Sequence, residues 1–63
     1  MTQYITLTEI QRAALVERNG LYYLEFTFPH QLNVFELARD EKGFYPTNIW
    51  AHTFAELIQM GVI

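Results

Sequence analysis

The stretch VERNGLYYLEFTF, residues 16–28, predicts a β-hairpin and decides the fold of this 63-residue chain. Asn19-Gly20 is the preferred pair for a two-residue type I′ turn, because both positions need a positive φ and the twist of the turn matches the flanking strands. Residues 21–28 then alternate between two faces of a strand. One face carries Tyr22, Leu24, Phe26 and Phe28, and the other carries Leu21, Tyr23, Glu25 and Thr27.

The segment before the turn allows two interpretations. A strand that starts near Ala13 would place Arg18 opposite Leu21 across the turn. Thr6-Leu7-Thr8-Glu9 also fits a capping box, which would begin a helix over residues 7–18 and make Asn19-Gly20 its C-terminal cap. We favour the hairpin, preceded by a short strand near residues 3–7 and a helical turn near residues 8–11.

Two further strands are predicted after the hairpin. Pro29 ends the second strand because it cannot donate to a ladder. Residues 34–38 form a third strand with Phe35 and Leu37 pointing inward and Val34 pointing outward. Phe44-Tyr45 forms a short fourth strand that stops at Pro46.

The last predicted element is a helix that begins at Thr47 or Asn48 as N-cap. Its apolar stripe, at spacings of four, seven and eight residues, consists of Trp50, Phe54, Leu57 and Ile58. Gly61 suits the position just after the helix, and Val62-Ile63 would fold back onto the last turn. The fold class is therefore α+β: residues 1–63 form one small domain, in which a three- to four-stranded antiparallel sheet carries a C-terminal helix on one face.

The composition argues against an enzyme. The chain contains neither cysteine nor serine, which excludes disulfides, thiolate zinc sites and the two commonest covalent nucleophiles. His30 and His52 are far apart in the sequence, and neither has an acidic residue at a diagnostic spacing. The three glycines are isolated, so no phosphate-binding loop is present. We predict no catalytic residue, no metal ligand and no cofactor.

Charge and hydropathy also limit the partners. The net charge is −3, with Lys42 and three arginines as the basic residues, which disfavours nucleic acid because each phosphate contact needs a cation. No run approaches the ~18 apolar residues of a membrane helix. The start of the chain lacks the basic and apolar regions of a secretory signal, so we expect a cytoplasmic protein without membrane contact.

The excess of aromatic residues favours a protein-binding function. Aromatic residues make up 16% of the chain, and one helix can cover only one face of the sheet. We predict that the other face binds another protein or a second copy of the chain as a homodimer, with Tyr23 as anchor. The predicted protein-binding residues are Val16, Arg18, Leu21, Tyr23, Glu25 and Val34.

The predicted function is thus that of a small non-enzymatic regulatory or adaptor protein, and a phage- or mobile-element-encoded inhibitor is one form of it. The alternative is a single-stranded nucleic-acid-binding module in which bases stack on the sheet aromatics. That alternative requires Tyr23 and an arginine side by side on an exposed face.

Overall fold

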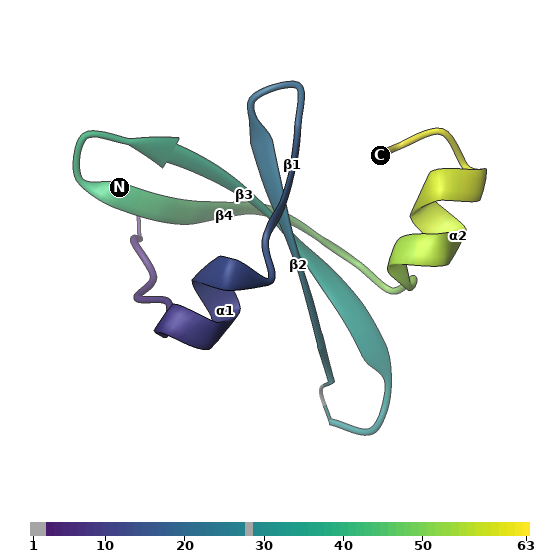
Figure 1. Cartoon of the computed structure of the whole chain (residues 1–63). Coiled ribbons are helices and arrows are strands. Elements are labelled where there is room, and N and C mark those ends of the chain that lie inside the picture. The colour runs from purple at the N-terminus through teal and green to yellow at the C-terminus, as the bar shows by residue number, and fades with distance from the viewer. Residues whose placement is uncertain (1–2, 28) are drawn as a thin grey trace.

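The computed structural model, which describes residues 3–27 and 29–63, contains a four-stranded antiparallel sheet in the order β1-β2-β3-β4. Its strands are β1 (Val16–Arg18), β2 (Leu21–Thr27), β3 (Leu32–Asp40) and β4 (Gly43–Trp50). A helix precedes the sheet, α1 (Glu9–Ala13), and another follows it, α2 (Phe54–Gln59) (Figure 1). The predicted α+β class is confirmed. Phe28 lies outside the described residues.

The Asn19-Gly20 turn has the predicted geometry. Asn19 and Gly20 have φ values of 53° and 83°, and Arg18 pairs with Leu21. The Glu17 carboxylate supports the turn by accepting a hydrogen bond from the Gly20 N–H at 3.0 Å. The hairpin prediction is therefore confirmed, and the alternative of one helix over residues 7–18 is wrong.

The first strand begins at Val16 rather than near Ala13, because α1 occupies the preceding residues. Thr8 is the N-cap, and its hydroxyl accepts from the Gln11 N–H while the Gln11 side chain accepts from the Thr8 N–H. The helical turn expected near residues 8–11 is thus present, although the capping box joins Thr8 to Gln11 and not Thr6 to Glu9.

The N-terminal arm, residues 3–8, does not form the strand expected near residues 3–7. Only Ile5 forms a β-bridge, in which its N–H donates to the Phe44 carbonyl at 2.9 Å. This bridge holds the arm across the sheet, so that Leu7 enters a buried cluster.

Strand β4 continues through Pro46 to Trp50, so the prediction that Pro46 ends the strand is wrong. β4 is at the edge of the sheet, where a residue without an N–H can leave its unpaired side outward. Pro46 pairs with Leu37, whereas Asn48 pairs with Glu36, which leaves Thr47 as the extra residue of a bulge. The Thr47 hydroxyl donates to the Glu36 carboxylate at 2.7 Å.

Helix α2 begins later than predicted, at Phe54 with Thr53 as N-cap, because residues 47–50 belong to β4. Its end is as predicted. Gly61 has a φ of +81°, its N–H donates to the Ile58 carbonyl, and the Val62 N–H donates to the Leu57 carbonyl. These two bonds form a Schellman motif, which turns Val62 and Ile63 back onto the helix.

Both faces of the sheet are covered, which the sequence did not predict. The N-terminal core lies beneath the N-terminal arm and contains the buried residues Leu7, Leu24, Leu37 and Phe44. The C-terminal core lies beneath α2 and contains Tyr23, Val34 and Leu57, with Trp50 and Phe54 packed against them. The two helices lie on opposite sides of the sheet (Figure 1). The helices of the described residues, five and six residues long, are too short to span a membrane.

Candidate binding surfaces

The face predicted to be exposed is the face that α2 covers. Tyr23 and Val34 are only 3% and 0% exposed, because both lie in the C-terminal core with Leu57. The expectation that Tyr23 anchors an exposed surface and that Val34 points outward is therefore wrong. Leu21 is half-buried against the same core, whereas the predicted residues Val16 and Arg18 are exposed beside the turn.

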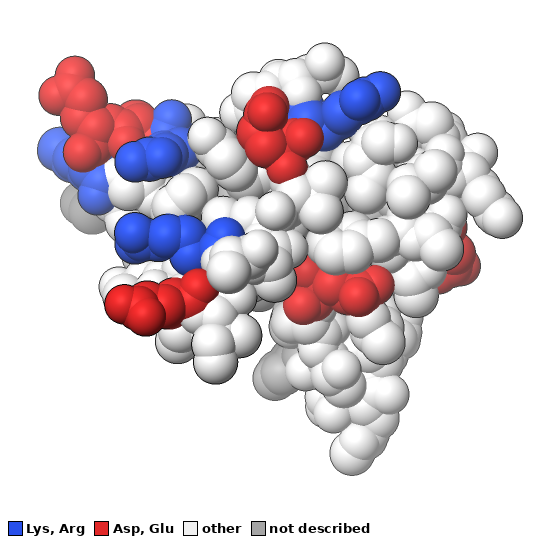
Figure 2. Space-filling model, viewed as in Figure 1, with Lys and Arg blue, Asp and Glu red and all other residues white. Residues whose placement is uncertain are grey.

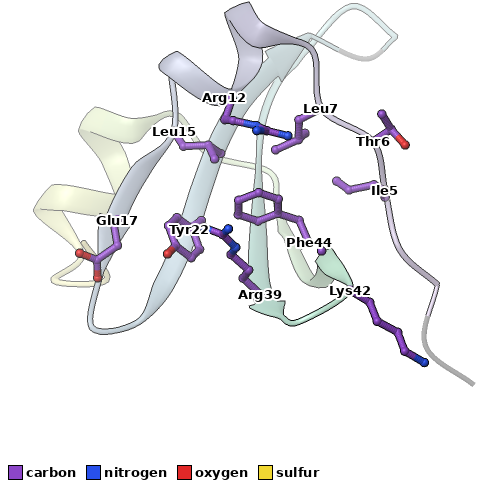
Figure 3. Close-up of a pocket in the computed structure, with 11 residues that line it drawn as sticks. Ile5, Thr6, Leu7, Arg12, Leu15, Glu17, Tyr22, Arg39, Lys42 and Phe44 are labelled. Carbon is purple, nitrogen blue, oxygen red and sulfur yellow. The ribbon is translucent and has the colours of Figure 1, made fainter.

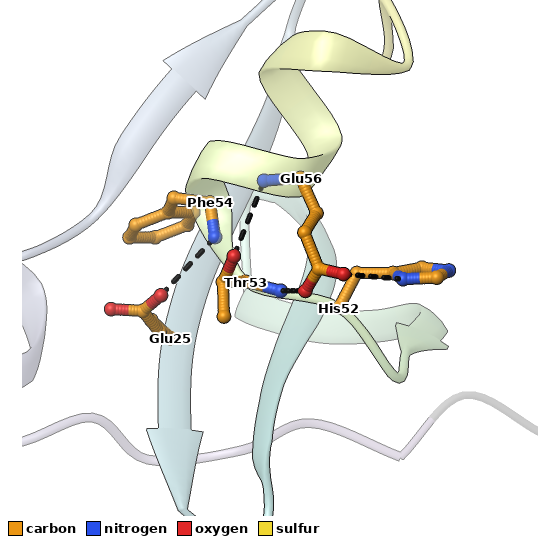
Figure 4. Close-up of polar contacts among 5 residues, drawn as sticks. All are labelled: Glu25, His52, Thr53, Phe54 and Glu56. Atoms are coloured by element: carbon orange, nitrogen blue, oxygen red, sulfur yellow. Dashed lines mark hydrogen bonds and ion pairs between the residues drawn. The ribbon is translucent and has the colours of Figure 1, made fainter.

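Glu25 is exposed but has a structural partner. Its carboxylate accepts a hydrogen bond from the Phe54 N–H at 3.1 Å, which ties β2 to the first turn of α2 (Figure 4). Glu56 completes this end of the helix, since its carboxylate accepts from the Thr53 N–H at 2.8 Å and lies 3.8 Å from His52. The six predicted binding residues are thus divided between the core, the turn and a helix cap. Their role in binding a protein stays a prediction.

Glu36 is the centre of a polar network on the α2 side of the sheet. Besides Thr47, it accepts hydrogen bonds from the Tyr23 hydroxyl at 3.4 Å and the Trp50 ring N–H at 3.3 Å. Burial, and secondly the Glu36 charge, raise the pKa of Tyr23, so the phenol keeps its proton. The Glu36 carboxylate thus accepts hydrogen bonds from three neutral donors. Because these donors stand on β2 and β4 and Glu36 stands on β3, we assign the carboxylate the role of joining the three strands.

The first candidate surface is an apolar patch formed by Phe26, Phe35 and Ile49. The rings of Phe26 and Phe35 stack with centroids 4.2 Å apart and planes 7° apart. Ile49 is 57% exposed and pairs with Phe35 across the strands. These residues and Asn33 line a shallow groove of about 420 Å³. The patch lies on the face of the N-terminal core, and the joined end of β2 and β3 extends beyond both helices (Figure 1).

The second candidate surface is a basic groove of about 470 Å³ between the N-terminal arm, α1 and the β3–β4 hairpin (Figure 3). Its lining includes three of the four basic residues in the chain, Arg12, Arg39 and Lys42. Sequence reasoning missed this groove because Arg12 is far from the other two in the sequence. The apolar patch was missed because Phe26 and Phe35 were assigned wholly to the core, whereas both are half-buried and only Phe35 packs against the N-terminal core.

Among the described residues, no three His, Cys, Asp or Glu side chains are grouped so that they could hold a metal ion. The two surfaces are therefore the features of the described chain from which a function can be argued. Comparison with models of protein families, with curated proteins and with solved structures finds no match to this chain.

Proposed function

We propose that this chain is a small non-enzymatic protein-binding module and that it binds through the apolar patch. The observation that supports the proposal is the position of a stacked aromatic pair and a largely exposed isoleucine at the uncovered end of a sheet face. Clusters of this kind, without charged residues at their centre, are typical of interface cores. Among the described residues, no charged side chain lines the groove that runs from Phe26 to Ile49.

An open strand edge adjoins the patch. β1 pairs with Leu21, Tyr22 and Tyr23 only, so no strand among the described residues pairs with that edge of β2 over residues 25–27. Backbone groups in an antiparallel strand alternate between its two edges. Leu21 flanks a two-residue turn, so its backbone N–H and C=O groups point toward β1. At every second residue the groups point the same way, and those of Glu25 and Thr27 therefore point to the open edge. Such an edge can pair with a further strand.

The partner that we propose is a second copy of this chain. If two β2 edges pair antiparallel about Phe26, each Glu25 lies opposite a Thr27, so like charges do not meet. The two Phe26 side chains become direct neighbours, and the two patches join into one surface with two-fold symmetry. The chain carries a net charge of −3, and the uncharged patch is a place where two copies can meet without repulsion.

The function can be tested by sedimentation velocity on the wild-type chain and on Thr27→Glu. We expect a concentration-dependent dimer for the wild type and dimerisation weakened about tenfold in the variant, because each Glu25 would then lie opposite a second glutamate across the paired β2 edges. Gln59→Glu is the matched control, since it adds the same charge at an exposed position on α2, away from the β2 edge. A wild type that remains monomeric up to about 1 mM would contradict the homodimer.

The sheet aromatics do not favour the alternative function of single-stranded nucleic-acid binding. Tyr23, which that hypothesis needs at the surface beside an arginine, is buried. Phe26 and Phe35 stack on each other, and no cation lines their groove.

A further inference from the structure

The basic groove has an apolar floor and a cationic rim. Phe44 and Leu7, both buried, form the floor together with half-buried Tyr22, whose ring meets that of Phe44 edge-to-face at 5.2 Å. Arg12 of α1 and Arg39 of β3 lie on either side of the Phe44 ring, and Lys42 extends from the β3–β4 turn (Figure 3). The Arg39 guanidinium carbon is 5.3 Å from the centre of that ring.

The three cations form no close ion pair in the part of the chain that the structure describes, although the charge of Lys42 does act on Asp40. Among the described residues, no carboxylate oxygen lies within 4.0 Å of a side-chain nitrogen of Arg12, Arg39 or Lys42. The carboxylates nearby are engaged elsewhere. Glu17, which also lines the groove, accepts from the Gly20 N–H, and Asp40 accepts from the Tyr4 hydroxyl at 2.6 Å.

The charge distribution of the whole chain makes this arrangement unusual. Six of the seven acidic residues and only one of the four basic residues lie outside the groove lining. Most of the Lys and Arg surface in Figure 2 lies on the left of the view, where Figure 1 shows α1 and the β3–β4 hairpin, and Asp and Glu surface lies beside it. The lining of the groove itself carries three cations and one carboxylate, which favours an anion as ligand.

The size and lining of the groove restrict the ligand. A volume of about 470 Å³ is within the range of small-molecule sites, and the lining of the groove is about equally polar and apolar. Two arginines can bind a carboxylate or phosphate through paired N–H groups, whereas lysine acts as a point charge. Arg12 and Arg39 are thus suited to contact the ligand, and Lys42 to raise its local concentration.

We propose that the groove binds a small amphipathic anion, that is, a single carboxylate or phosphate group attached to an aromatic body. The aromatic body lies on Phe44 and Tyr22, and the anionic group lies between Arg12 and Arg39. This site is on the opposite end of the sheet face from the apolar patch and is independent of the proposed dimer.

The test is a titration of the ¹⁵N-labelled full chain, followed by NMR, with phenyl phosphate, inorganic phosphate and phenol as separate probes. We expect phenyl phosphate to shift the amide signals of Leu7, Arg12 and Phe44. We also expect it to bind at least about tenfold more tightly than phenol, which lacks the charge-assisted hydrogen bonds. Inorganic phosphate binding as tightly as phenyl phosphate would overturn the proposal, because the aromatic floor would then have no role.

Matched variants locate the site. Arg12→Gln and Arg39→Gln should each weaken phenyl phosphate binding about tenfold, whereas Arg18→Gln, which removes the one basic residue outside the lining, should leave it unchanged. Arg12 is exposed and has no ion pair among the described residues, so Arg12→Gln decides the test if Arg39→Gln unfolds early. An equal loss in Arg18→Gln would show non-specific attraction and overturn the proposal. Tighter binding of an oligothymidylate at the same amides would overturn it in favour of nucleic acid.

Discussion

Exposed carboxylates act in this protein mainly as caps of turns and helices. Glu17, Glu25, Asp40 and Glu56 each accept a hydrogen bond from a backbone N–H. Asp40 accepts two, from Lys42 at 2.8 Å and Gly43 at 3.3 Å, and so supports the turn between β3 and β4. More than half of the acidic residues thus stabilise local structure. They are spread along the chain because the turns and helix ends that they cap are spread along it.

Two of these carboxylates predict how the stability depends on pH. The hydrogen bond from the Tyr4 hydroxyl is the main cause that lowers the pKa of Asp40, and the Thr53 N–H is the main cause that lowers the pKa of Glu56. A pKa that is lower in the folded state gives a stabilisation that is complete above the unfolded-state pKa and is lost as the pH falls through the folded-state pKa. We therefore expect the urea midpoint to fall as the pH drops below about 4.

The double variant Asp40→Asn, Glu56→Gln should be less stable than the wild type at neutral pH and lose less stability on acidification. Urea midpoints measured by circular dichroism at a series of pH values test this expectation. Glu41→Gln is the control, since Glu41 is an exposed neighbour for which no hydrogen bond is found. Parallel pH profiles for the double variant and the wild type would show that these two caps do not matter.

At the scale of the elements, short helices are held by well-defined ends. α1 and α2 span five and six residues, and each begins with a threonine in a capping box. Helices of this length are not stable alone in water, so their caps and tertiary contacts must hold them. For α2 these are Glu25 at the first turn, the Schellman motif at the last and Leu57 in the C-terminal core.

Gly20 and Gly61 offer a matched test of the turn and the helix end. Both have a positive φ, and an added Cβ would meet no atom within 4 Å at either position, so only the backbone conformation opposes a side chain. Gly20→Ala and Gly61→Ala should each lower the free energy of unfolding by about 1–2 kcal/mol. Thermal melts followed by circular dichroism measure this loss.

Asparagine serves as the control at the first position because it tolerates the left-handed region better than alanine does. Gly20→Asn should recover part of the stability lost in Gly20→Ala. If Gly20→Ala instead melts with the wild type, the turn does not need a positive φ at this position.

On the scale of the whole molecule, stability depends on two small cores on opposite faces of one sheet. The largest side chain buried in the C-terminal core is Tyr23, which connects β2 to α2. Truncating a buried aromatic residue to alanine costs ~3–5 kcal/mol, and small proteins have only about 5–15 kcal/mol in total. Removal of one such side chain therefore threatens the whole fold.

We expect Tyr23→Ala to be largely unfolded and Tyr23→Phe to stay folded, because phenylalanine keeps the packing and loses only the 3.4 Å hydrogen bond to Glu36. Urea unfolding, followed by circular dichroism and by the fluorescence of the single tryptophan, distinguishes the two variants. Native-like stability of Tyr23→Ala would mean that α2 does not pack on this face.

Local backbone chemistry made several features predictable from the sequence. Asn19-Gly20 set the hairpin and its register because few residue pairs adopt positive φ at two successive positions. Gly61 marked the end of α2 for the same reason. The α+β class followed from strand-like alternation before residue 46 and from the helical spacing of Trp50, Phe54, Leu57 and Ile58, although Trp50 belongs to β4 and the helix begins only at Phe54.

Tertiary structure alone decided which face each helix covers. Residues 21–27 place apolar side chains on both faces, so their alternation could not distinguish the face beneath α2 from the face beneath the N-terminal arm. The bridge from Ile5 to Phe44 and the tolerance of the edge strand for Pro46 depend on neighbours distant in the sequence. The same holds for both candidate surfaces: Arg12 and Arg39 come together, and Ile49 stays uncovered, only because the arm crosses one end of the sheet and leaves the other end open.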